Sequence, residues 1–161
     1  MDTKVWYNPA KGVVQPKGWG MVMSPVRILV VDDSELFRRF MISALQMSPA
    51  LQVICSVADG FAAVAKAEEL RPDVILLDIG LPGQNGIEAG RQIRRCAPES
   101  KIIFVSQESS ADIVQETLSL GALGYVVKTS AGNDLLPAVA AVICSKQFVS
   151  SALAYSNFTH T

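Results

Sequence analysis

Residues 26–46 read VRILVVDDSELFRRFMISALQ, a pattern that predicts a buried strand, a short turn and an amphipathic helix. The first six residues are almost continuously apolar, as expected for a strand that helices cover on both faces. Ser34 lies in the turn, where its side chain can cap the helix that follows. The apolar residues of that helix recur on one stripe, which comprises Leu36, Phe37, Phe40, Met41, Ala44 and Leu45.

The same strand–helix unit recurs along the chain, so that five such units are expected. The other expected strands are 51–57, 74–77, 101–105 and 124–127, and the other expected helices are 61–70, 87–96, 111–120 and 135–144. This alternation predicts an α/β fold with a doubly wound parallel sheet and right-handed crossovers. Pro137 is expected in the first turn of the last helix, where its missing N–H costs little.

The two ends of the chain differ from this regular middle part. Residues 1–24 contain Pro and Gly at short intervals and sustain no apolar period, which predicts an irregular N-terminal extension. An alternative is that translation begins at Met21 or Met23, close to the first strand. We expect one domain at 25–147, followed by a C-terminal tail or linker at 148–161.

Composition and charge exclude several classes of protein. Fourteen basic and fifteen acidic residues give a net charge of −1, so a basic surface for direct nucleic-acid binding is not expected. The apolar runs are far shorter than the ~20 residues of a membrane span, and no secretory signal pattern is visible. The three cysteines are widely spaced and form no C-x-x-C, which favours free thiols in a reducing compartment. We therefore expect a cytoplasmic protein with no membrane segment.

Polar residues stand where the expected strands end. Asp32 and Asp33 follow the first strand, Asp78 the third, Ser106 the fourth and Lys128 the fifth. The carboxyl ends of parallel strands meet at one edge of the sheet, and ligands of open α/β sheets bind there. The sequence thus predicts that three carboxylates, a hydroxyl and an ammonium converge on one site.

Three carboxylates in one crevice repel each other, by about 3 kcal/mol per pair at ~5 Å and an effective dielectric constant near 20. A hard divalent cation such as Mg²⁺ (or Mn²⁺) removes this repulsion and also binds phosphate. We expect Asp33 to be a direct metal ligand and Asp32 to act through water or by orienting Asp33. Asp78 stands alone on the central strand, so we expect it to be the nucleophile that carries a phosphoryl group, with Lys128 as a second positive charge.

Four segments together resemble the receiver domain of bacterial two-component response regulators. They are VRILVVDD (26–33), VILLDIGLPGQNGIEA (74–89), IIFVS (102–106) and GALGYVVK (121–128). The resemblance covers roughly residues 26–147. The ending GYVVKT, with Thr129 where many receivers have a cis-proline, is similar to the NarL/FixJ subfamily.

This resemblance implies a flavodoxin-like (βα)5 fold with a five-stranded parallel sheet in the order 2-1-3-4-5. It also implies a signalling switch that accepts phosphate from a sensor histidine kinase or a phosphotransfer protein, and not an enzyme acting on other molecules. The site residues that it implies are Asp78 as phosphoacceptor, Asp33 and Asp32 as the acidic metal pair, the backbone carbonyl of Gly80 as a further metal ligand, Ser106 as switch hydroxyl, Lys128 as the conserved-type lysine and Tyr125 as switch aromatic.

Gln107 and Glu108 depart from the family pattern. Gln107 is bulkier than the small residue that often follows the switch hydroxyl, and Glu108 and Gly80 occupy positions that commonly tune the lifetime of the phosphoryl group. Subfamily members usually carry a C-terminal DNA-binding domain, for which this chain has no room. It is therefore expected to be a single-domain regulator or a piece of a longer protein.

Three alternatives accompany these expectations. The main one is a pseudo-receiver, a protein-interaction module that works without phosphorylation. A haloacid-dehalogenase-like phosphatase is disfavoured because its second aspartate would fall on Gly80. For Tyr125, the alternative to an inward-turning switch is a half-buried strand aromatic whose hydroxyl lies in water.

We expect the output surface on helix 111–120, with phosphorylation-dependent homodimerisation as one use of it.

Overall fold

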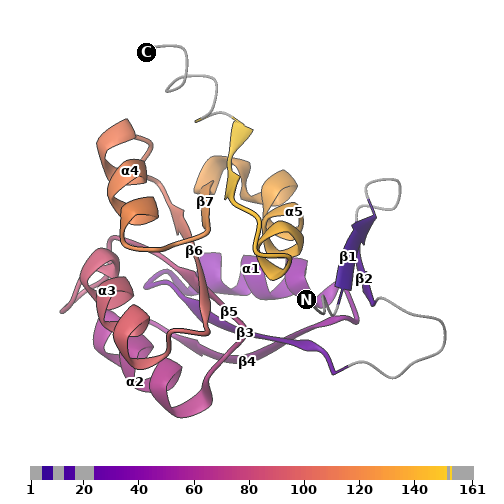
Figure 1. Ribbon diagram of the computed structural model, residues 1–161, viewed down its shortest axis with the longest axis horizontal. Coiled ribbons are helices and arrows are strands. Elements are labelled where there is room, and N and C mark those ends of the chain that lie inside the picture. Colours follow the sequence, from indigo (N-terminus) through magenta and orange to yellow (C-terminus); the bar gives the residue numbers. More distant parts are fainter. Residues whose placement is uncertain (1–4, 9–12, 17–23, 152, 154–161) are drawn as a thin grey trace.

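Most strands of the chain form one parallel sheet, whose central strands are buried on both faces. A computed structural model describes residues 5–8, 13–16, 24–151 and 153 (Figure 1). The sheet has six strands in the order β4-β3-β5-β6-β7-β8. The strands are β3 (Val26–Val31), β4 (Leu51–Val57), β5 (Val74–Leu77), β6 (Lys101–Ser106), β7 (Gly124–Val127) and β8 (Phe148–Val149).

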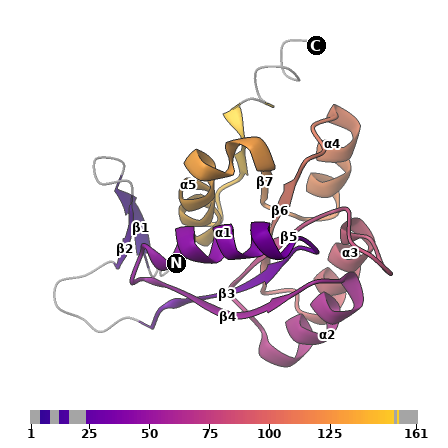
Figure 2. The same ribbon diagram turned by 180° about the vertical axis from the view of Figure 1, so that it is seen from behind.

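Five helices cover the two faces of this sheet, as Figures 1 and 2 show from opposite sides. They are α1 (Glu35–Gln46), α2 (Gly60–Leu70), α3 (Gly86–Cys96), α4 (Ala111–Ser119) and α5 (Ala131–Ile143). One buried cluster joins the sheet to α1 and α5, through residues such as Met41 and Leu135. A second cluster joins the other face to α2, α3 and α4, through residues such as Ala63, Ile93 and Val114. The doubly wound α/β fold is therefore confirmed.

The sheet is one strand wider than expected. The order 2-1-3-4-5 holds for the first five strands, β3 to β7. The sixth, β8, runs parallel to β7 and pairs Phe148 with Gly124 and Val149 with Tyr125. Two apolar residues, Phe148 and Val149, are too short a run to predict a strand, and they were therefore expected to belong to the C-terminal tail. That segment, 148–161, thus begins inside the sheet, and its residues 152 and 154–161 lie outside the described part of the chain.

The N-terminal segment also contains regular structure where an irregular extension was expected. β1 (Val5–Asn8) and β2 (Val13–Pro16) form a two-stranded antiparallel sheet that contacts α5. Neither strand is long enough to show a period in a sequence so often interrupted by Gly and Pro. The other residues of the predicted extension, apart from Ser24, lie outside the described residues. The domain boundaries themselves stay a prediction.

Helix α5 begins earlier than expected, directly after a 3₁₀ turn at Lys128–Ser130. Pro137 therefore lies inside the helix and not in its first turn. At that position the ring removes one i to i−4 hydrogen bond of the helix. Tertiary burial of the apolar residues of α5 compensates for this loss. Within the described part of the chain, no helix has the length and apolarity that crossing a bilayer demands.

Gly86 lets α3 approach the end of β5 very closely. A Cβ atom built on Gly86 would overlap the backbone oxygen of Asp78 and crowd Ile79. The Gly86 N–H donates to the Ile79 carbonyl oxygen at 2.7 Å, which holds the intervening loop in a tight turn. Glycine is thus required here for packing, and the loop behind Asp78 depends on it.

The first prediction is that Gly86→Ala destabilises the protein by about 1–3 kcal/mol, because a methyl group must displace the backbone at Asp78. Gly132→Ala is the matched control, since the nearest atom to a Cβ there is Phe40 Cζ at 4.0 Å. Alanine has a higher helix propensity than glycine, so Gly132→Ala should leave the free energy of unfolding unchanged or raise it by up to about 1 kcal/mol. Urea unfolding measures both free energies, and equal values for the two variants would contradict the packing role of Gly86.

Candidate functional site

A cavity of about 310 Å³ opens at the carboxyl ends of the strands. Its lining residues are Asp33, Ser34, Asp78, Gly80, Ser106, Gln107, Glu108 and Lys128. Seven of these eight were singled out in the sequence, and Ser34 was expected only as a helix cap. Ser34 does cap α1, since its Oγ accepts the N–H of Phe37 at 3.2 Å. Asp32 and Tyr125 do not line the cavity, and both side chains are fully buried.

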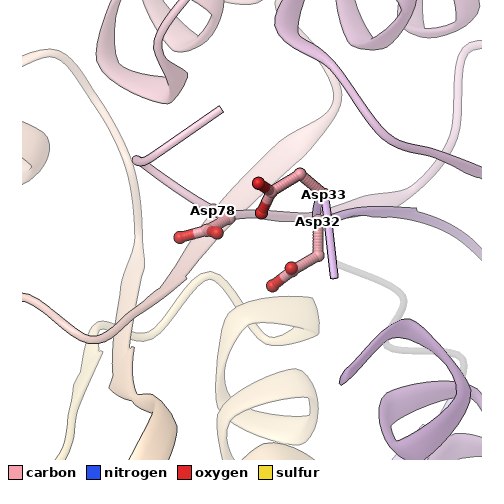
Figure 3. A group of neighbouring side chains, drawn as sticks. All are labelled: Asp32, Asp33 and Asp78. Carbon is pink, nitrogen blue, oxygen red and sulfur yellow. The ribbon is translucent and has the colours of Figure 1, made fainter. Parts of the chain in front are cut away.

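The three aspartates gather at one point although they come from two strands. One carboxylate oxygen from each of Asp32, Asp33 and Asp78 lies within 4.8 Å of the others. Figure 3 shows the three side chains projecting from the ends of β3 and β5 toward the same region. Asp32 and Asp78 are buried, whereas Asp33 is exposed. An all-oxygen set of this kind fits a hard cation such as Mg²⁺, which prefers oxygen ligands, and two of its members line the cavity.

Lys128 compensates part of the negative charge. Its ammonium lies 2.7 Å from Asp32 Oδ2 and 3.1 Å from Asp78 Oδ2. The Phe37 ring lies under the same ammonium, 4.7 Å from its centroid, which is within the range of a cation–π contact. The lysine side chain is only 12% exposed, so it is held in place between two carboxylates and an aromatic ring.

Burial and neighbouring charges shift the pKa values of both Asp78 and Lys128. Burial raises the pKa of Asp78, and the charge of Asp32 raises it further. Lys128 and the N–H of Ile79 oppose this shift without cancelling it. Burial acts to lower the pKa of Lys128, but its hydrogen bonds to Asp32 and Asp78 and their charges outweigh burial and raise the pKa. An ammonium that stays charged therefore faces a carboxylate that is costly to ionise.

Ser106 and Tyr125 meet at the backbone of Glu108. Ser106 Oγ accepts the Glu108 N–H at 3.1 Å, and the Tyr125 hydroxyl donates to the Glu108 carbonyl oxygen at 2.7 Å. Burial raises the pKa of Tyr125 to about 12, so this hydroxyl remains a donor at neutral pH. The alternative of a half-buried tyrosine with its hydroxyl in water is thus wrong. The ring already lies inside the protein, so no inward turn is needed in this conformation.

Two contributors escaped the sequence reasoning. Arg38 was not among the predicted site residues, but its Nη1 donates to the Asp32 carbonyl oxygen at 2.6 Å and so holds the turn that carries both acids. The backbone of Glu108 joins Ser106 to Tyr125, whereas only its side chain had been considered. Both contacts use main-chain atoms, which leave no pattern in a sequence. Gln107, Glu108 and Gly80 are exposed at the cavity, and their effect on phosphoryl lifetime stays a prediction.

Comparisons with known proteins agree with this geometry. A family model described as "Response regulator receiver domain" matches residues 28–140. The transcriptional regulatory protein LiaR of Bacillus subtilis is 38% identical over 116 residues, which cover 72% of this chain and 55% of LiaR. This chain spans about half the length of such curated relatives.

Solved structures of response regulators superpose on this chain. A LuxR-family two-component response regulator from Aurantimonas sp. superposes with a TM-score of 0.80 at 29% identity, covering 84% of this chain and 97% of that one. The response regulator domain of CheB from Thermotoga maritima has a TM-score of 0.67 at 35% identity, covering 75% and 95%.

The second prediction follows from the raised pKa of Asp78. A folded-state pKa above the unfolded value means that the ionised carboxylate destabilises the metal-free protein at neutral pH. Asp78→Asn should therefore raise the melting temperature in EDTA, by about 2–5 °C. The difference from wild type should shrink as the pH falls through the raised pKa and Asp78 takes up a proton. Scanning calorimetry measures these melting temperatures. Asp33→Asn is the control, and it should change the melting temperature less because the Asp33 carboxylate is exposed. A melting temperature of Asp78→Asn below that of the wild type would contradict the destabilising role of the ionised Asp78.

Proposed function

Because the chain belongs to the response-regulator receiver domains and is NarL/FixJ-like, we propose that it is a phosphorylation-dependent signalling switch of a two-component system. The observation that carries this proposal is the ammonium of Lys128 between Asp32 and Asp78, at 2.7 and 3.1 Å. In this proposal Asp78 is the phosphoacceptor. The donor is a phosphohistidine on a sensor histidine kinase or a phosphotransfer protein.

The transfer forms a bond from a carboxylate oxygen of Asp78 to phosphorus and breaks the bond from phosphorus to the donor nitrogen. The electron pair of the broken bond leaves with the imidazole of the donor. Lys128 places a fixed positive charge beside the Asp78 carboxylate as the phosphoryl group arrives. The N–H of Ile79 donates to Asp78 Oδ1 at 2.8 Å and orients the carboxylate.

Mg²⁺ or Mn²⁺ is the cofactor in this proposal. Asp33 and Asp78 would hold it directly together with the carbonyl oxygen of Gly80, and Asp32 would act through water. The ion would supply positive charge to the phosphoryl oxygens. The three neighbouring carboxylate oxygens and the raised pKa of Asp78 support this assignment.

Ser106 is the group that we propose to sense the phosphoryl group. Phosphorylation adds about −1.5 to −2 charges and three acceptor oxygens. A hydrogen bond from Ser106 to one of them contributes ~1.5–3 kcal/mol, whereas inverting a 1:99 equilibrium needs about 5.5 kcal/mol. One hydroxyl is therefore not enough, and Lys128 has to contribute. The bond from Tyr125 to Glu108 carries movement of the Ser106 loop into β7.

The loop after Ser106 leads into α4, whose N-cap is Ser110. We therefore place the output surface on α4 and propose that two phosphorylated chains associate through it. The protein acts in the cytoplasm, assists only its own phosphorylation and dephosphorylation, and does not bind nucleic acid directly through this chain. Gln107, Glu108 and Gly80 line the path of the phosphoryl group and tune its lifetime.

The third prediction is that incubation with acetyl phosphate and Mg²⁺ adds the mass of one phosphoryl group, measured on the intact protein. Asp78→Asn should abolish the adduct because the accepting oxygen is lost. Lys128→Ala should slow its formation by about tenfold or more, because one positive charge is removed from the transition state. EDTA should stop the reaction.

Asp112→Asn is the control for these variants, since Asp112 is exposed in the first turn of α4. It should react like the wild type. An adduct that persists in Asp78→Asn would contradict the assignment of the acceptor. No adduct with acetyl phosphate or with any phosphohistidine donor would instead favour the pseudo-receiver, the interaction module that works without phosphorylation.

A further inference from the structure

Resting on the function proposed above, we propose that Ser150 is a positioning residue for Lys128 and acts through the carboxyl end of β7. Ser150 lies ten residues beyond the segment that the family model matches, 28–140. It belongs to what we call the C-terminal strap, residues 148–153, of which the structure describes all but residue 152. Nothing in the site chemistry assigned so far uses this strap.

Ser150 holds the end of β7 with two hydrogen bonds. Its Oγ accepts the N–H of Val127 at 3.1 Å, and its own N–H donates to the carbonyl oxygen of Tyr125 at 2.9 Å. The residue is fully buried, so water cannot replace the hydroxyl without a rearrangement. A buried N–H that loses its acceptor costs more than the net contribution of the bond itself. The hydroxyl of Ser150 therefore fixes the Val126–Val127 peptide, which carries this N–H, in one position.

Val127 is the residue directly before Lys128, and it is the last residue of β7. Its backbone is extended, with φ −77° and ψ 134°, and the 3₁₀ turn begins at the next residue. The Val126–Val127 peptide that Ser150 holds therefore sets, through the single residue Val127, the point from which the lysine side chain leaves the sheet. A shift of this peptide would move the ammonium relative to Asp32 and Asp78, from which it lies 2.7 and 3.1 Å away.

The strap is itself anchored on both sides of Ser150. Before it, the N–H of Phe148 donates to the Leu123 carbonyl oxygen at 2.9 Å, and Val149 pairs with Tyr125. After it, the N–H of Leu153 donates to the Ser150 carbonyl oxygen at 2.9 Å. The Leu153 side chain is 2% exposed and belongs to the buried cluster under α2, α3 and α4. Ser150 is thus held firmly enough to hold β7 in turn.

Linkage makes this arrangement reciprocal. If the bond from Val127 to Ser150 favours the lysine position that a phosphoryl group on Asp78 needs, then the phosphoryl group must strengthen that bond by the same free energy. The strap would therefore become more ordered on phosphorylation, at a place outside the cavity and next to β7.

The fourth prediction compares Ser150→Ala with Ser151→Ala in the full chain. Ser151 is exposed and next in sequence, so its variant should behave as wild type. Ser150→Ala should accelerate hydrogen exchange of the Val127 amide about tenfold and lower the maximal phosphorylation rate at saturating acetyl phosphate by about three- to tenfold. The dissociation constant for Mg²⁺ should not change, because the carboxylates are untouched.

The outcomes separate this inference from the function on which it rests. If the wild-type protein is not phosphorylated, both the proposed function and the positioning role of Ser150 are contradicted. A wild type that is phosphorylated, with Ser150→Ala reacting at the same maximal rate, would overturn the positioning role alone, even if the Val127 amide exchanged faster.

If Ser150→Ala does not fold, hydrogen exchange in the wild-type chain still tests the positioning role of Ser150. Exchange of its Val127 amide should slow about three- to tenfold on phosphorylation. An unchanged rate would overturn the proposal.

Discussion

Two carboxylates that are buried beside a single ammonium impose the main constraint on this protein. Asp32 and Asp78 are almost fully removed from solvent, and Lys128 contacts both. One positive charge cannot neutralise two negative ones, and the third acid, Asp33, adds to the excess. Burial first, and then the charge of Asp32, raises the pKa of Asp78. This cluster is the reason why we propose that an added cation completes the site and that the cation and Lys128 then share a phosphoryl group.

The fold meets this constraint by placing each charged group at the end of a rigid strand. β3 and β5 are adjacent and carry the acids, whereas Lys128 follows β7, two strands away from β5. Main-chain contacts then fix the ends of these strands. Arg38 holds the carbonyl oxygen of Asp32, and the backbone of Glu108 links the ends of β6 and β7 through Ser106 and Tyr125. These contacts hold the ends of β3, β6 and β7 around the cavity.

The sequence was sufficient for the fold and for most of the site because both follow from side-chain patterns. Continuous apolar runs identified the parallel strands, and the rule that ligands bind at carboxyl strand ends brought Asp33, Asp78 and Lys128 together. What it missed depends on backbone or on very short elements. The hydrogen bond of Tyr125 is made to a carbonyl oxygen, β8 is only two residues long, and Pro137 lies inside α5 because that helix begins at Ala131. None of these produces a periodic signal.

The two-residue strand β8 also changes how the sheet meets its surroundings. A free strand edge presents unpaired N–H and C=O groups on which another chain can add, and long exposed edges invite aggregation. Without β8 that edge would be the four-residue strand β7, which is apolar throughout. With it, the outermost strand is too short to template a partner, and Ser150 occupies the next N–H of β7. Removing the residues from 148 onward would therefore expose the edge of β7 and favour aggregation, independently of any signalling role.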